Sequence, residues 1–351
     1  MGVIESRKQR DDALALAVRP QGTTVTAGTD EFALINRLAW LLDPPTHGIG
    51  IGDDAATWSP TPGTVTVATT DMLVEGIHFR LDWTTPEDLG WKAMAVNLSD
   101  IAAMGARPRH ALVSIALKPD QAGIVIEIYK GIAAHARASG TFVVGGDTVR
   151  TDGPLTINVT LLGEADPALI LRRDGARPGD VLAITGTAGG SAAGLALLSG
   201  EPTDSDPDRS RRLLAMHHRP SPRLHAGPAL ASLGARCGID ISDGIASEAG
   251  HLARSSNVAI VIDVDAVPFH PDAVAMFGLE RARTLGLNGG EDYELLVALP
   301  LSLVDRARDA IASETTLTVI GRVVQDQHGG LVTATSGGLP FTLGAGGYVA
   351  F

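Results

Sequence analysis

The chain has 351 residues, of which 44% are hydrophobic, and a formal net charge of −12 at pH 7. This charge disfavours nucleic acid and anionic membrane surfaces as main partners, because both repel an acidic protein. The single cysteine, Cys237, excludes an internal disulfide and a cysteine-based zinc site. No apolar run approaches the roughly 20 residues of a membrane span, and residues 1–20 lack a signal-peptide core, so we expect a cytoplasmic protein.

The first half of the chain is predicted to be an extension followed by an α/β domain. The extension covers residues 1–28, and a helix is expected to begin near Thr29-Asp30-Glu31, ahead of apolar residues at helical spacing. A second helix opens at Thr85-Pro86-Glu87, with proline at the first helical position and acids in the first turn, and closes near Gly105. The other elements expected here are strands near 65–70, 111–117, 141–144 and 155–162, and a helix at 121–139.

The alternation of strands and helices restarts after a polar seam at residues 163–178. A strand at 181–185, a glycine turn and a helix at 191–198 are followed by a polar stretch at 200–212. The sequence therefore predicts an α/β fold of two mixed-sheet domains, residues 29–165 and 166–351, with helices flanking the second sheet. The later elements expected are helices near 221–233 and 244–256 and strands near 258–264, 293–299 and 317–323.

Six short motifs place acidic side chains beside glycine or just after an apolar run. One such turn would mean nothing, because glycine and aspartate are common loop residues, but six indicate a cluster of the hard oxygen ligands that Mg²⁺ prefers. Without a cation, unit charges about 4 Å apart repel by roughly 4 kcal/mol at an effective dielectric constant of about 20. We therefore predict a magnesium–nucleotide site. The motifs are residues 50–54, 69–71, 97–100, 145–148, 240–244 and 289–292.

Each motif also has an ordinary structural explanation. Asp53 and Asp54 fit a solvated turn, residues 69–71 fit the end of a strand, and His78 alone fits a structural histidine. Asn97 and Asp100 are more demanding, because they share one face of an apolar helix and a buried aspartate is costly unless it is paired or metal-bound.

The glycine turn at 186–191 fits either a phosphate cradle or a plain strand–helix turn. It is not a Walker loop, because no Gly-Lys-Ser/Thr occurs in the chain. ATP chemistry would then rely on metals and arginine, and Arg172 or Arg173 at the seam offers that charge or forms a surface pair.

Taken in order, the motifs resemble the thiamine-monophosphate kinase family of the aminoimidazole-ribonucleotide-synthetase superfamily. The resemblance spans about Asp30 to Tyr348; the N-terminal extension and the glycine-rich tail at 344–347 depart from the family pattern. It implies ATP-dependent phosphorylation of thiamine monophosphate to the diphosphate, and an N-terminal domain that pairs with its twin in a homodimer. The motifs that carry it are Ile51–Ala55, Thr70-Asp71 with Gly76 and His78, Val96–Gly105, Val144–Thr148, Ile239–Gly244 and Asn288–Leu295.

By position, the resemblance also implies roles for individual residues. The magnesium ligands it implies are Asp54, Thr69, Thr70, Asp71, Asp100, Asp147, Asp240 and Asp243, and among them Asp71, Asp100 and Asp147 are the ones implied in catalysis. The nucleotide contacts it implies are Gly146, Asp147, Arg173, Ser242 and Tyr129, and the substrate contacts are His78, Glu291 and Tyr348.

The expected chemistry needs no strong protein base, because the attacking phosphate oxygen of the substrate is already anionic. In-line positioning and metal ions that neutralise both phosphate chains would then supply catalysis, by direct transfer without a phosphoenzyme. Within the superfamily, the reactive N-terminal Cys or selenocysteine of the selenide-dependent dikinases and the C-terminal Cys of the hydrogenase-maturation relatives are absent from this chain. The ribonucleotide synthetase itself, a two-metal phosphohydrolase and a nucleotide-binding regulator without turnover remain alternatives.

Overall fold

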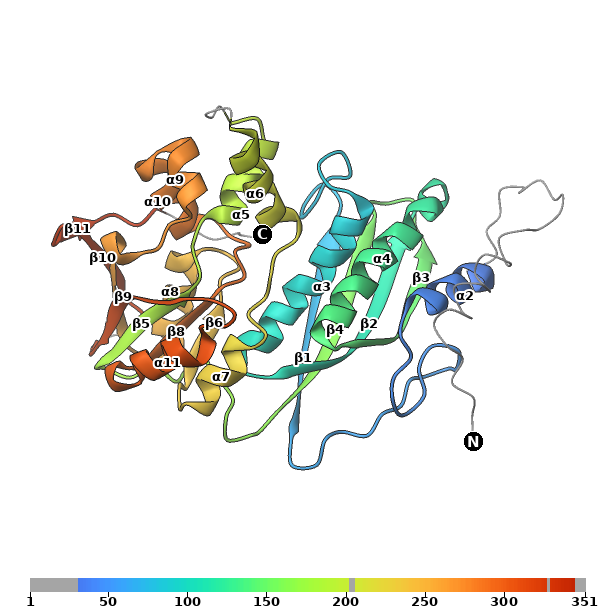
Figure 1. Ribbon diagram of the computed structural model, residues 1–351, viewed down its shortest axis with the longest axis horizontal. Helices are drawn as coiled ribbons and strands as arrows, with labels where there is room; N and C mark the ends of the chain where they lie inside the picture. Colours follow the sequence, from blue (N-terminus) through green and yellow to red (C-terminus); the bar gives the residue numbers. More distant parts are fainter. Residues whose placement is uncertain (1–30, 202–205, 327–328, 345–351) are drawn as a thin grey trace. The chain divides into compact units, whose positions relative to one another are not determined.

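The computed structural model describes residues 31–201, 206–326 and 329–344 (Figure 1). Residues from Arg37 onward form one compact unit that contains two sheets. The first sheet has the strand order β1-β4-β2-β3, in which β4 is antiparallel to both of its neighbours and β2 is parallel to β3. Its strands are β1 (Val65–Val74), β2 (Arg107–Leu117), β3 (Phe142–Arg150) and β4 (Thr156–Ala165), and helix α2 (Glu31–Leu41) precedes them in the chain.

Two helices, α3 (Pro86–Ala103) and α4 (Ala122–Ser139), cover one face of this sheet (Figure 1). Helix α3 begins where the Thr85 side chain accepts a hydrogen bond from the Asp88 N–H at 3.1 Å, as the capping pattern predicts. The helices approach closely at Gly90 and Gly131, where an added Cβ would lie 1.9 Å from a carbonyl oxygen of the facing helix. Helix α3 is buried almost all round. Its close contact with α4 therefore fixes the positions of its polar side chains.

The second sheet has seven strands in the order β11-β10-β7-β9-β5-β8-β6, and only the β7–β10 pair is parallel. Core residues such as Leu182 and Ile260 pack against α8 (Ile245–Ser256), while Val297 and Leu299 belong to a second cluster with α7 (Ala226–Ser232) and α11 (Val304–Ile311). The strands are β5 (Asp180–Thr185), β6 (Cys237–Asp240), β7 (Ala259–Asp263), β8 (Leu295–Pro300), β9 (Leu317–Val324), β10 (Val332–Ser336) and β11 (Leu339–Phe341). The remaining helices are α5 (Gly190–Leu198), α6 (Pro207–His218), α9 (Pro271–Phe277) and α10 (Leu279–Asn288), with short 3-10 turns at Pro119–Gln121, Val264–Ala266 and Leu301–Leu303.

Two mixed sheets with helices confirm the predicted fold class, but several element predictions were wrong. Strand β1 was expected to end near Thr70 but continues to Val74, so Asp71 lies inside it, and Gly145–Thr148 lie inside β3, not in a turn after it. Both are edge strands that pair on one side only, which tolerates polar and glycine residues that a central strand would disfavour.

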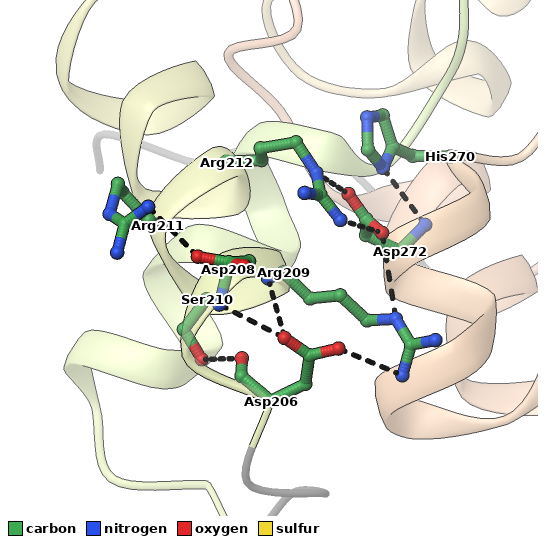
Figure 2. Close-up of polar contacts among 8 residues, drawn as sticks. All are labelled: Asp206, Asp208, Arg209, Ser210, Arg211, Arg212, His270 and Asp272. Atoms are coloured by element: carbon green, nitrogen blue, oxygen red, sulfur yellow. Dashed lines mark hydrogen bonds and ion pairs between the residues drawn. The ribbon is translucent and has the colours of Figure 1, made fainter.

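The polar stretch at 200–212 was assigned no helix from the sequence, but α6 starts at Pro207. The Asp206 side chain caps α6 by accepting hydrogen bonds from the Asp208 and Arg209 N–H groups at 2.9 and 3.2 Å. Figure 2 shows how Arg212, through a bidentate pair with Asp272 at 2.6 and 2.8 Å, ties the helix to α9. Caps and ion pairs, not an apolar stripe, therefore define this helix.

Helix α3 also contacts the segments around the second sheet. The Trp91 indole N–H donates to the Pro220 carbonyl at 3.0 Å, just beyond α6, and the Ser99 hydroxyl donates to Asp240 at 2.7 Å, at the end of β6. None of the helices in the described ranges combines the length and apolar character that crossing a bilayer requires.

Candidate active site

A cavity of about 990 Å³ opens beside α3. Its apolar wall includes Phe79, Trp83 and Leu195, and its polar lining includes Lys92 and Glu291. The volume and the mixture of aromatic and charged side chains suit a small ligand with both ring and charged parts.

Three carboxylates from separate segments gather near this cavity: Asp71 on β1, Asp100 on α3 and Asp240 at the end of β6. Burial, and to a smaller extent the charge of Asp100, raises the pKa of Asp71 to about 6. Burial and then the same charge raise the pKa of Asp240 to about 7, while the charge of Arg173 acts in the opposite direction. The charge of Asp100 contributes to the shifts of both other acids, so the three lie within electrostatic reach of one another.

Neutral hydroxyl groups hold two of these carboxylates in place. The Ser99 hydroxyl donates to Asp240. The Thr69 hydroxyl, on the same face of β1 as Asp71, donates to a carboxylate oxygen of Asp100. Burial raises the pKa of Asp100, whereas the hydrogen bond from Thr69 and the charge of Arg173 lower it. Arg173 thus brings a positive charge to these three carboxylates.

The donor set suits Mg²⁺ in its chemistry. It consists of hard oxygens, and the uncompensated charge of three neighbouring carboxylates favours a cation. Among the described residues, no three or more His, Cys, Asp or Glu side chains come together as a group that could hold a metal ion by themselves. An incomplete protein shell fits an ion that keeps several waters and shares substrate phosphates.

The loop after β6 carries Ser242 and Asp243 toward the cavity. The Glu248 carboxylate, buried in the first turn of α8, accepts a hydrogen bond from the Asp243 N–H at 3.0 Å, and burial raises its pKa to about 8. The Ser242 carbonyl in turn accepts from the Glu291 N–H at 2.8 Å. Gly290 permits this approach, because a Cβ there would lie 1.9 Å from that carbonyl oxygen.

Glu291 has a strained backbone and a buried ionic partner. Its φ is +67° and that of Tyr293 is +52°, which are uncommon values for residues other than glycine. The Lys92 ammonium, with a side chain 5% exposed, lies 2.8 Å from a Glu291 carboxylate oxygen. Burial acts to raise the pKa of Glu291, but the charges of Lys92, His217 and His78 and the hydrogen bond from Lys92 together lower it. An ionised carboxylate therefore faces the cavity, and His78 lines the same cavity.

Other predicted site residues lie apart from the acidic group. Asp54 is exposed in the loop before β1, and the Thr70 hydroxyl lies 3.0 Å from Thr160 on β4, on the alternate face of β1. Tyr129 is buried on α4 and is not among the described residues that line the cavity, and burial raises its pKa. Tyr348 lies outside the described residues.

Gly146 and Asp147 lie on β3, at the opposite edge of the sheet from β1. The register runs from Asp71 through Val159 and Val113 to Gly146, so three strand spacings, roughly 14 Å, separate the two ends. Asp147 is exposed and does not join Asp71, Asp100 and Asp240 within one chain.

The sequence did not reveal Lys92, His217 or Tyr293 as members of this region. Lys92 carries a local signal, since it is a lone charge just ahead of the apolar run of its helix. His217 carries none, because only the folded chain brings α6 to α3, whereas Tyr293 lies inside the Asn288–Leu295 motif but was given no role there.

Comparison with known proteins identifies the family. Residues 52–165 match the model of the AIR synthase related protein N-terminal domain, and residues 177–334 match that of its C-terminal domain. The chain is 35% identical over 308 residues to the thiamine-monophosphate kinase of Bacillus subtilis, covering 82% of this chain and 94% of that relative. It is 37% identical over 306 residues to the Escherichia coli K12 enzyme of the same name, covering 86% and 92%.

Solved structures agree with these matches. The thiamine-monophosphate kinase from Stenotrophomonas maltophilia K279a is 34% identical, with a TM-score of 0.79 and coverage of 89% of this chain and 98% of that one. AaThiL, solved in complex with AMPPCP and TMP, is 31% identical, with a TM-score of 0.70 and coverage of 93% and 100%. The likeness at 22% identity to the hydrogenase maturation protein HypE concerns the fold alone. Together these matches show that the chain belongs to the thiamine-monophosphate kinase family, within the AIR synthase-related proteins.

Proposed function

We propose that this protein transfers the γ-phosphoryl group of ATP to the phosphate of thiamine monophosphate and so forms thiamine diphosphate. One observation supports the proposal most strongly: the three carboxylates of Asp71, Asp100 and Asp240 adjoin the cavity, because Asp71 also lines it. The family membership and the AMPPCP and TMP bound by AaThiL support the two substrates.

We infer that Asp71, Asp100, Asp240 and Asp243 hold Mg²⁺ together with the phosphates, with Thr69, Thr70, Asp54 and Asp147 as the further ligands. When bound, Mg²⁺ would neutralise charge that develops on the phosphate chains. Arg173 supports the nucleotide phosphates with a positive charge, and Gly146, Ser242 and Tyr129 are the other nucleotide contacts in this proposal.

The residues of the chain act mainly by binding and orientation. Phe79 and Trp83 offer aromatic surfaces to the rings of thiamine, while His78, Glu291 and Tyr348 are the proposed polar contacts. The acceptor phosphate attacks in line and needs no protein base, because it is already anionic at neutral pH. Transfer is therefore direct.

A homodimer completes the proposed site. Asp147 cannot reach Asp71 within one chain across roughly 14 Å of sheet, so we infer that it serves a site of the partner chain. The exposed side chains of Met72 on β1 and Val149 on β3, 53% and 46% accessible, offer apolar area for such pairing.

The proposal extends to domains and location. The division into residues 29–165 and 166–351, after an extension at 1–28 that lies outside the described residues, agrees with the two matched family domains. The cytoplasm is the proposed location, because ATP is available there.

One assay separates this function from its alternatives. Incubation with Mg-ATP and thiamine monophosphate should yield thiamine diphosphate and ADP. Phosphate release without acceptor would indicate a hydrolase instead, and nucleotide binding without any conversion would indicate a regulator. Capture of a phosphorylated enzyme after incubation with labelled ATP would contradict direct transfer.

A further inference from the structure

A partly buried lysine–glutamate pair joins α3 to the loop before β8, at the wall of the cavity. The Lys92 Nζ lies 2.8 Å from Glu291 Oε2, and the two side chains are 5% and 27% exposed. His217 from α6 is the third member, with Nδ1 3.3 Å from the same oxygen and 3.1 Å from the Ser191 hydroxyl. Both side-chain contacts of Glu291 use Oε2, and no described residue is bonded to Oε1.

Lys92 is the positive charge of this group. Burial and then the charge of Lys92 lower the pKa of His217 to about 4, so its imidazole is neutral at pH 7. A buried ion pair rarely stabilises a fold more than apolar side chains of the same size would. The left-handed backbone of Glu291, with φ of +67°, adds a second cost at the same residue. The ion pair and the left-handed backbone both cost stability at one carboxylate that faces the cavity. This combination indicates that Glu291 has a role in binding.

We propose that Lys92 is a positioning residue that holds the Glu291 carboxylate ionised and turned so that Oε1 meets the substrate. This inference rests on the proposed function and deepens it. The ligand chemistry that such an oxygen recognises is a cationic, N–H-bearing heterocycle, which the thiazolium and aminopyrimidine rings of thiamine supply. Lys92 thereby selects for the base of the substrate and not for its phosphate.

The helix that carries Lys92 also carries Asp100, eight positions later, about 12 Å along the helix axis. One rigid helix therefore fixes the distance between Lys92, which positions Glu291 for recognition of the base, and the carboxylate of Asp100. This geometry predicts that loss of Lys92 weakens the use of thiamine monophosphate while leaving the use of ATP unchanged.

The proposal also predicts a change in pH dependence. The titratable groups that face Glu291 are Lys92 from α3, His217 and His218 from α6, His78 from the loop after β1, and Tyr293 from its own segment. Of the groups that lower the pKa of Glu291, Lys92 contributes most, ahead of His217 and His78. Without it, burial raises the pKa of Glu291, and the acidic limb of kcat/KM for thiamine monophosphate moves to higher pH.

The test compares Lys92→Met, Lys92→Arg and Glu291→Gln in the full chain, with Lys130→Met as the matched control. Lys130 is a lysine on α4 that is 47% exposed and paired only with Glu127 at the surface, so its variant should behave as wild type. For Lys92→Met we expect KM for thiamine monophosphate to rise roughly tenfold to a hundredfold, with KM for ATP unchanged. Lys92→Arg should restore much of the loss, and the double variant Lys92→Met with Glu291→Gln should lose no more than Glu291→Gln alone.

Several outcomes would overturn the proposal. One is an unchanged KM and acidic limb in Lys92→Met, and another is an equal rise in KM for both substrates. Additive losses in the double variant would also overturn it. If Lys92→Met unfolds, Lys92→Arg together with Glu291→Gln decides, because a positioning role requires that only Glu291→Gln lose affinity. Wild-type protein that binds thiamine monophosphate by calorimetry but does not phosphorylate it would refute the proposed function alone, and the Kd of each variant would then replace KM.

Discussion

Asp240 shows how binding and stability oppose each other at a single residue. Its carboxylate is buried, its pKa is raised to about 7 by burial and by neighbouring acids, and the hydrogen bond from Ser99 only partly offsets this. An acid whose pKa is higher in the folded than in the unfolded protein destabilises the fold as pH rises above the unfolded value. We infer that the Asp240 carboxylate serves as a ligand of a cation, which offsets this cost.

Replacement of Asp240 by Asn should therefore stabilise the protein in the absence of divalent metal. At pH 8 the amide keeps a partner for Ser99 and removes the buried charge, so the melting temperature should rise by a few degrees. Thermal unfolding with and without Mg-ATP measures this. Added Mg-ATP should stabilise the wild type more than the variant, and a variant that melts lower in metal-free buffer would contradict the repulsion.

Asp71 is predicted to be essential for turnover but not for folding. Asp71→Asn removes one charge from a half-buried group and leaves a side chain of nearly the same shape. We expect a loss in kcat of roughly 100-fold or more with an unchanged circular dichroism spectrum. A rate within twofold of wild type would remove Asp71 from the proposed machinery.

At the scale of elements, α3 depends on glycine in the facing helix. A Cβ at Gly131 would lie 1.9 Å from the Glu87 carbonyl oxygen, at the first turn of α3. Gly131→Ala should therefore force the helices apart and reduce the free energy of unfolding by about 1–3 kcal/mol. Urea denaturation measures this cost.

Gly123→Ala in the same helix is the matched control. An added Cβ there meets no atom within 4 Å, so the free energy of unfolding should rise by up to about 1 kcal/mol through helix propensity. Equal effects of both substitutions would show that helix propensity, not the close approach, governs this helix pair.

Ion pairs of similar geometry should differ in their contribution to stability according to burial. Arg223 forms a bidentate pair with Glu294, whose side chain is 2% exposed, whereas Arg212, whose own side chain is 57% exposed, pairs with Asp272 (Figure 2). Arg223→Met should lower the free energy of unfolding by about 3–5 kcal/mol because it strands a buried carboxylate, and Arg212→Met by less than about 1 kcal/mol. Chemical denaturation of the two variants tests the difference, and a larger loss from Arg212→Met would contradict it.

Local signals and long-range contacts explain what the sequence could predict. The cap at Thr85 and the left-handed Gly140 gave the limits of α3 and α4 within a residue or two, because capping is a local property. The end of β1 was misplaced at Thr70, because pairing with β4, and not local preference, extends the strand through Asp71 to Val74. The Lys92–Glu291 pair was not predictable, since 199 residues separate its members.

At the scale of the whole molecule, assembly decides whether the site is complete. If Asp147 serves the partner's site, a mixture of Asp71→Asn and Asp147→Asn chains should regain activity that neither variant has alone. A heterodimer would contain one intact site, so random exchange should recover roughly a quarter of the wild-type rate. Light scattering should give the mass of a dimer. Confirmed exchange of subunits without any regained activity would show that both residues act within one chain.

In the proposed function, carboxylates from distant segments jointly bind metal beside the substrate cavity. Crystals grown with Mn²⁺ in place of Mg²⁺, a non-hydrolysable ATP analogue and thiamine monophosphate test it through the anomalous signal of manganese. We expect manganese peaks within coordination distance of oxygens of Asp71, Asp100 and Asp240, between the two phosphate chains. Peaks remote from all three carboxylates, with both ligands bound, would contradict it.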